Sequence, residues 1–152
     1  MIHCRPRGIC SWNYDLDGDG HRGRLDFNAM SEQGRIVADG AGYEVRKHGV
    51  MSGRWTLEEG SSVILSAAKP SAFTRTFELD GLAGSFVLEA ASAFGRTFHL
   101  RAGDGPIATL APEHAFTRRA MITIEHDDCD FRAICFAFWL VALTWRRQQS
   151  SS

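Results

Sequence analysis

Three carboxylates at alternate positions, Asp15, Asp17 and Asp19, are the sharpest candidates for chemistry in this sequence. Oxygens at this spacing, followed by a glycine that permits a sharp turn, open the calcium-binding loop of an EF-hand. The twelfth position is Asp26 instead of the usual glutamate, and the flanking residues have the pattern of strands, not helices. The preferred interpretation is therefore a solvated hairpin turn, and a calcium loop outside an EF-hand is the alternative.

A repeated motif carries arginines that could bind anions. Ser71–Phe77 is echoed by Ser92–Phe98 and more weakly by Ala115–Arg119, at a spacing of about 21 or 22 residues that fits one hairpin per unit. Because guanidinium groups bind carboxylate and phosphate well, equivalent arginines aligned on one surface predict an anion-binding strip. Its members would be Arg75, Arg96, Arg118 and Arg119. The preferred interpretation is nevertheless outward-facing strand arginines paired with glutamates, namely Glu78, Glu89 or Glu113, and the anion-binding strip is the alternative.

Signatures of common enzyme classes are missing from the sequence. It contains no GxSxG motif, no P-loop and no dinucleotide-binding fingerprint. Its four cysteines include no CxxC pair, and their spacing from the histidines matches no compact zinc site. We therefore expect a binding or scaffold module without a cofactor, and not an enzyme.

The net charge indicates which partners to expect, and the first ten residues indicate the cellular compartment. The 152 residues include 17 basic and 18 acidic side chains, so no overall field draws the chain to nucleic acid, and we expect none as a partner. Residues 1–10 lack the continuous apolar stretch of a signal peptide. We accordingly expect a cytoplasmic protein.

Most of the chain has the pattern of an antiparallel β-protein. From Ser11 to His126, short segments alternate between apolar and polar residues and are interrupted by Gly, Pro, Asp or Ser. Asp-Gly pairs at several interruptions are typical of tight hairpins, including those at Asp17–Gly20, Asp39–Gly40 and Asp104–Pro106. About eleven or twelve strands are too many for a flat sheet of this size, so the pattern predicts a closed barrel.

A different segment follows the strands. Residues 131–145 are almost entirely apolar, with aspartates before them and Arg146 and Arg147 after them, which suits the dipole of a helix. The uninterrupted apolar part is about 13 residues long, short of the ~20 needed to span a bilayer. We therefore predict a central helix near 131–147 that fills the barrel, within a single domain of residues 1–147, followed by a polar tail of residues 148–152.

On these strands, the repeated motif and the closing helix, the chain resembles the tubby C-terminal-like superfamily. That superfamily includes tubby proteins, phospholipid scramblases and LURP-one-related proteins, and the chain is most similar to small bacterial LURP-one-type members. The resemblance covers roughly Asp15 to Arg147 and implies a closed barrel of about twelve strands around a central helix. Tubby domains bind phosphoinositides through a basic pocket, but the sequence shows no counterpart of that pocket.

The expected function is a non-enzymatic binding or scaffold module with an anionic ligand such as a phospholipid headgroup. An anionic lipid or a protein is the expected partner, and the chain is not expected to be transmembrane. Two alternatives stay open: an intracellular carrier of a small hydrophobic ligand, which the helix in the barrel disfavours, and an enzyme with an unrecognised site.

Overall fold

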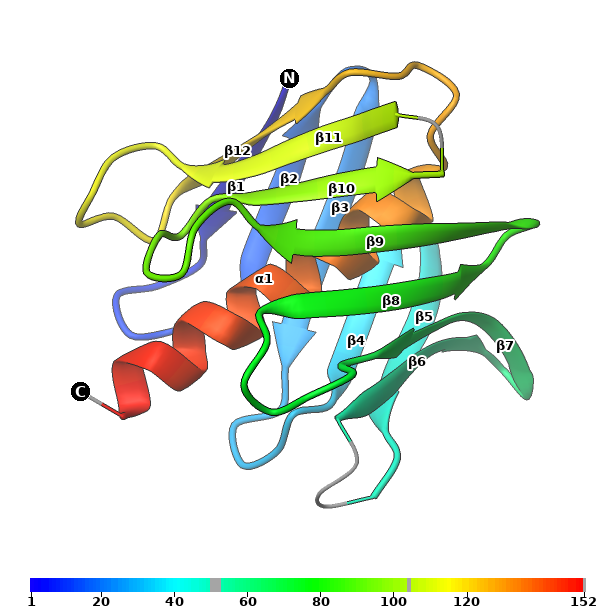
Figure 1. Cartoon of the computed structure of the whole chain (residues 1–152), viewed down its shortest axis with the longest axis horizontal. Helices are drawn as coiled ribbons and strands as arrows, with labels where there is room; N and C mark the ends of the chain where they lie inside the picture. The colour runs from blue at the N-terminus through cyan, green and yellow to red at the C-terminus, as the bar shows by residue number, and fades with distance from the viewer. Residues whose placement is uncertain (50–52, 104, 152) are drawn as a thin grey trace.

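A closed antiparallel barrel surrounds one helix in the computed structural model, which describes residues 1–49, 53–103 and 105–151 (Figure 1). The described residues form twelve strands, each paired with its neighbour in sequence, and β1 pairs with β12 to close the barrel. The predicted fold class is confirmed. The strands are β1 (Ile2–Pro6), β2 (Tyr14–Gly18), β3 (His21–Phe27), β4 (Gly34–Ala38), β5 (Ala41–Lys47), β6 (Arg54–Glu59), β7 (Ser62–Ala68), β8 (Thr76–Gly81), β9 (Gly84–Ala90), β10 (Phe98–Ala102), β11 (Gly105–Pro112) and β12 (Ala120–Ile124), and the helix is α1 (Phe131–Ser150).

Asp-Gly pairs form the tight turn between β2 and β3 and the tight turn between β4 and β5. Asp19 and Gly20 have φ angles of 51° and 79°, and Asp39 and Gly40 have φ angles of 49° and 86°. Positive φ at both central residues is typical of the type I′ turn, whose twist matches that of paired strands. The turn expected at 104–106 begins at Asp104, which lies outside the described residues.

Alternation within the strands separates the inner and outer faces of the barrel wall. In β8, Phe77 and Leu79 are buried against the interior, whereas Glu78 between them is exposed. The inward side chains of all twelve strands and the apolar residues of α1 form one hydrophobic core in the described residues. The period of two in the sequence therefore fixes which side chains meet the helix.

The helix α1 occupies the interior and is enclosed on every side. Each residue from Ala133 to Leu143 is at most 1% exposed, over about three turns. Gly23 in β3 permits close approach, because a Cβ atom there would lie 3.2 Å from both the Cys135 sulfur and the Phe131 ring. The predicted central helix is confirmed. Within the described residues, no helix is long and apolar enough to cross a membrane.

Local hydrogen bonds define both ends of α1. The side chain of Asp130 accepts a hydrogen bond from the backbone N–H of Arg132 and caps the positive end of the helix dipole. The helix continues past the expected end at Arg147 to Ser150, so residues 148–150 are helical instead of part of a tail. The carbonyl oxygen of Arg147 accepts the backbone N–H of Ser151, and the hydroxyls of Ser150 and Ser151 donate to the same oxygen.

Truncating a large side chain in the middle of α1 tests the enclosure. Phe138→Ala should lower the free energy of unfolding by roughly 3–5 kcal/mol, because a barrel wall on every side cannot collapse into the cavity. The matched control is Phe94→Ala, since Phe94 is 96% exposed and its loss should change stability by less than about 0.5 kcal/mol. Urea denaturation of both variants measures the difference. Similar stabilities for the two variants would contradict the enclosed helix.

Candidate functional site

Five fully described loops and the end of α1 gather at one end of the barrel, and we call these six segments the loop crown (Figure 1). The β5–β6 connection follows an odd-numbered strand as well, but it is described only in part and is not counted. Connections that follow odd-numbered strands share one end, because each strand is antiparallel to the next. The indole N–H of Trp145 donates to the carbonyl oxygen of Arg96 at 3.1 Å, which holds the helix end among the loops. The loop crown consists of residues 7–13, 28–33, 69–75, 91–97, 113–119 and 146–151.

Arg75, Arg96 and Arg118 occupy equivalent positions in three crown loops, and we call them the loop-linking arginines. Each precedes a strand, and its guanidinium group crosses to the next loop around the barrel, where it donates hydrogen bonds to backbone carbonyl oxygens. The acceptors are Ser92 and Ala93 for Arg75, Ala115 and Thr117 for Arg96, and Gly8, Ile9 and Ser11 for Arg118. The repeat in the sequence thus corresponds to a repeated contact between neighbouring loops.

Aromatic rings support these guanidinium groups from the core side. The guanidinium carbon of Arg96 lies 4.4 Å from the centre of a Trp145 ring, and that of Arg75 lies 5.3 Å from the centre of the Phe98 ring. Arg118 lies 5.8 Å from Trp12 in the same way. Such cation–π contacts add attraction while the charge of each arginine is retained.

The helix end adds two arginines to the loop crown. Arg146 donates to three carbonyl oxygens of the β3–β4 loop, at 3.1 to 3.4 Å, and Arg147 forms an ion pair with Glu32 in that loop. Burial alone would raise the pKa of Glu32, but hydrogen bonds from Arg147 and Lys47 lower it to about 2. Glu32 is therefore a carboxylate at neutral pH and offsets one of its two cationic partners.

The pairing of the loop-linking arginines with glutamates is not observed. In the described part of the chain none of them forms an ion pair with Glu78, Glu89 or Glu113; Glu89 instead pairs with Arg101 at 2.8 Å. That interpretation is wrong because these arginines lie in loops and not on strand faces. Their acceptors are neutral carbonyl groups, so the positive charges stay uncompensated. Arg119, the fourth residue of the expected strip, is exposed and has no side-chain partner among the described residues.

Positive charge therefore concentrates at this end of the barrel. The loop crown holds eight Lys and Arg residues and two Glu residues, an excess of six positive charges in a chain with a net charge of −1. Burial, together with repulsion from the positive charges of Arg147 and Arg75, lowers the pKa of Lys69. The opposite end is acidic: the described residues 19–20, 39–40, 60–61, 82–83 and 125–130 include six Asp and Glu residues and no Lys or Arg.

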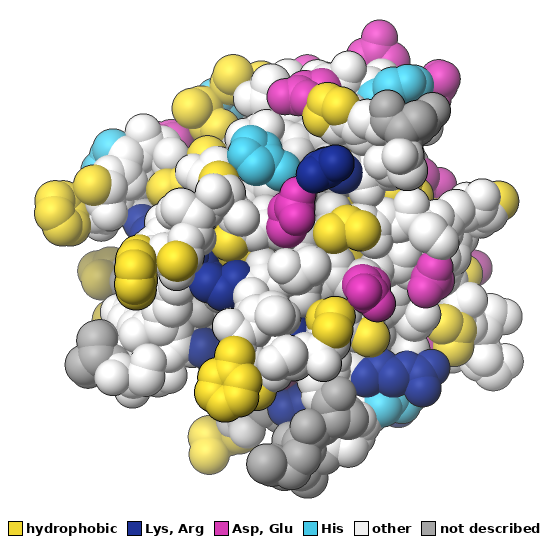
Figure 2. Space-filling view, viewed as in Figure 1, with side chains coloured by type: hydrophobic (Ala, Val, Ile, Leu, Met, Phe, Trp, Pro, Cys, Tyr) yellow, Lys and Arg dark blue, Asp and Glu magenta, His cyan; other side chains and the backbone are white. Residues whose placement is uncertain are grey.

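Large apolar side chains extend from the tips of the five crown loops. Figure 2 shows hydrophobic side chains protruding at the crown end, with Lys and Arg side chains between and behind them. Each tip residue is 92% to 98% exposed, and together they are Ile9, Met30, Phe73, Phe94 and Phe116. In the sequence, the three phenylalanines are recognisable only as part of a repeated motif. Their position between strands, next to small residues, was the signal that they lie at loop tips.

The three carboxylates of the possible calcium loop do not converge. Asp15 and Asp17 are exposed on β2, and Asp19 lies in the following turn. Each has a cationic neighbour: Arg7 at 3.3 Å from Asp15, Arg22 at 3.9 Å from Asp17, and the N-terminal ammonium for Asp19. The described residues contain no group of three or more His, Cys, Asp or Glu side chains that could hold a metal ion.

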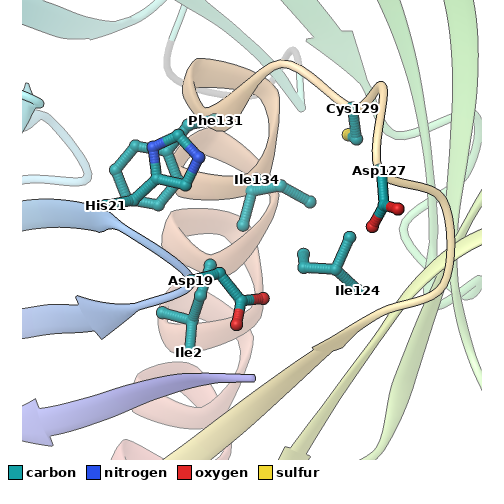
Figure 3. A pocket seen from close by; sticks show the side chains of 8 residues that line it. All are labelled: Ile2, Asp19, His21, Ile124, Asp127, Cys129, Phe131 and Ile134. Carbon is teal, nitrogen blue, oxygen red and sulfur yellow. The ribbon is translucent and has the colours of Figure 1, made fainter.

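A pocket of about 360 Å³ at the opposite, acidic end contains side chains of the types that act in enzyme active sites (Figure 3). Asp19, His21, Asp127 and Cys129 line it together with apolar residues. His21 stacks on Phe131 with ring centres 4.5 Å apart and contacts Asp39. Burial and the nearby Asp130 raise the pKa of Cys129 to about 11. The thiol is thus protonated at neutral pH, a poor nucleophile.

Removing one loop-linking arginine tests its structural contribution. Arg96→Ala deletes hydrogen bonds to two carbonyl oxygens and the contact with Trp145, so we expect a loss of roughly 1–3 kcal/mol of stability. Arg119→Ala, the control in an exposed position, should change stability by less than about 0.5 kcal/mol. The comparison is made by urea denaturation. Equal stability of the two variants would refute the linking contacts.

Calcium should have little effect on stability, because the carboxylates of Asp15, Asp17 and Asp19 are dispersed and have cationic neighbours. The expected melting temperature in millimolar calcium equals that in a chelator, as measured by differential scanning calorimetry. A rise of several degrees that disappears in Asp17→Asn would show that this hairpin binds the ion.

Comparisons of the chain with protein-family models, curated proteins and solved structures found no significant match.

Proposed function

We propose that this protein is a non-enzymatic binding module whose loop crown engages an anionic ligand of the phospholipid-headgroup class. The observation that carries the proposal is the excess of six positive charges at the crown end, opposite an acidic end. Such a separation orients the molecule in the field of a negative surface and speeds its association. Membership of the tubby C-terminal-like superfamily is part of the proposal, and the twelve-stranded barrel around a helix agrees with it.

Two further features of the arginines favour an anionic ligand. Their hydrogen bonds to carbonyl oxygens hold the guanidinium groups in place before any ligand arrives, so little side-chain entropy is lost on binding. In addition, the hydrogen bonds of Arg75 and Arg96 go to neutral carbonyl groups, so they leave the positive charge of each guanidinium group available to attract an anion.

The carrier and enzyme hypotheses are less well supported. The barrel interior, where a hydrophobic ligand would be carried, is filled by α1 along the buried stretch from Ala133 to Leu143. A pocket of about 590 Å³ lies at the acidic end of the barrel, where Phe86, Ile107 and His126 are among its lining residues. It combines apolar residues with a few polar groups, so a small ligand there is the second candidate function.

Charge reversal in the loop crown tests the proposed function. The double variant Lys69→Glu and Arg119→Glu should bind phosphatidylserine-containing vesicles at least about tenfold more weakly than the wild type, since each change reverses a charge near the surface. Arg22→Glu is the control, because Arg22 is 89% exposed but belongs to the opposite end of the barrel. Vesicle co-sedimentation across a salt series measures both. Binding that is insensitive to salt and to the double variant would contradict the proposal.

A further inference from the structure

We propose that the partner of the loop crown is a lipid bilayer, into which the apolar loop tips insert. This inference rests on the proposed function and adds to it the physical form of the ligand: a membrane surface and not a soluble anion. Phe73, Phe94 and Phe116 are the main inserting residues, and Ile9 and Met30 extend the same ring. The bound barrel would stand with its acidic end pointing away from the membrane.

Exposure of these side chains has no structural explanation within the barrel. The three phenylalanines are 96% to 98% exposed, although a buried Phe side chain stabilises a protein relative to an exposed one. Single exposed apolar residues are common, but here all five described crown loops carry one at the tip. Their gathering at one end indicates a shared apolar environment.

The arrangement of the tips favours a bilayer over a protein partner. The tips belong to separate loops, and the protruding hydrophobic side chains at the crown end stand apart from one another in Figure 2, so a protein would need a separate pocket for each. A bilayer interface accepts protruding side chains at any position around the ring. In Figure 2, Lys and Arg side chains lie between and behind the protruding hydrophobic groups, an order that matches acyl chains beneath charged headgroups.

The spacing within each motif determines how deep the phenylalanine and the arginine side chains would lie in the membrane. Each loop-linking arginine follows its phenylalanine by two residues, as Arg96 follows Phe94. The phenylalanine occupies the tip, while the guanidinium group turns back to the neighbouring loop and the ring beneath it. A tip buried about 5–10 Å into the interface would leave the guanidinium groups level with the phosphates. Both apolar burial and charge attraction then contribute to binding.

The hydrogen bonds between loops reduce the conformational entropy that the protein loses when the tips insert. The loop-linking arginines connect four neighbouring crown loops, which are those after β7, β9, β11 and β1. Arg146 connects the helix end to the β3–β4 loop. The loops therefore need not be ordered when the membrane is bound. The helix end at the centre of the ring is polar, with Gln148, Gln149 and Ser150, and suits the headgroup layer.

The decisive variant is the triple substitution Phe73→Ser, Phe94→Ser and Phe116→Ser, which keeps every charge. We expect at least about tenfold weaker binding to vesicles of phosphatidylcholine and phosphatidylserine, because binding strength scales with the apolar area buried. The melting temperature should be unchanged, since the replaced rings contact solvent. Val63→Ser, at an exposed position on β7, is the control for loss of surface apolar area and should bind like the wild type.

A direct measure of insertion uses Phe94→Trp. On binding the same vesicles, its added fluorescence should shift to shorter wavelength and be quenched by lipids brominated on the acyl chain, relative to wild type. Wild-type affinity in the triple variant, or no quenching in Phe94→Trp, would overturn insertion.

Three further experimental outcomes distinguish binding of an anionic ligand from insertion into a bilayer. Salt-sensitive binding of soluble inositol hexakisphosphate without binding to vesicles would leave the proposed function standing and overturn insertion. Equal binding to phosphatidylcholine alone and to phosphatidylserine-containing vesicles, lost in the triple variant, would support insertion and overturn the anionic preference. Concentration-dependent self-association in light scattering that is lost in the triple variant, without vesicle binding, would assign the tips to a second copy of the chain and overturn the bilayer.

Discussion

Enclosure of an all-apolar helix is the constraint on which the rest of the structure depends. Because no side of α1 between Ala133 and Leu143 is suited to water, the surrounding wall must be continuous. An open sheet would leave part of the helix exposed, and a barrel of eight strands would be filled by its own side chains. Twelve strands provide an interior that a helix fills, and Gly23 leaves room in the wall for Cys135 and Phe131 of that helix.

Closure determines where the barrel meets its surroundings. A closed sheet has no free edge, so partners can approach only the outer wall or the two ends. The wall carries many ion pairs between strand residues, such as Arg101 with Glu89, that neutralise one another. The ends differ in charge, and their signs complement the dipole of α1: acidic residues lie at its N-terminus and basic residues at its C-terminus. The polarity that stabilises the helix is thus the polarity a ligand would encounter.

Much of the fold follows from local patterns in the sequence. Alternation around Phe77 and Leu79 and the Asp-Gly turns at Asp19 and Asp39 define strands and hairpins over short distances. The unbroken apolar run identified α1, but not its end, because Gln148 and Ser150 have no pattern that separates a last helical turn from a tail.

The candidate site was less predictable than the fold. The repeat placed Arg75, Arg96 and Arg118 in equivalent positions, yet their acceptors are backbone carbonyls of other loops, about 20 residues away for Arg75 and Arg96 and 107 to 110 residues away for Arg118. Carbonyl oxygens carry no sequence signature, so glutamates were the natural but incorrect candidates. The ring of exposed tips likewise appears only when the barrel closes and brings Ile9 and Met30 beside the three phenylalanines.

The ladder between β1 and β12 has a consequence for how the chain reaches this state. Ile2 pairs with Ile122, so the barrel closes through contacts between strands at the two extremes of the sheet-forming sequence, and α1 follows all of them. If the barrel closed before the helix formed, the helix could not enter the interior. If the barrel closed only afterwards, the apolar inner face of the sheet would be exposed to water in the meantime. Synthesis in the order of the sequence delivers the helix last. We therefore expect the barrel to close only after α1 has emerged from the ribosome, so the apolar inner face of the nascent sheet is exposed until then.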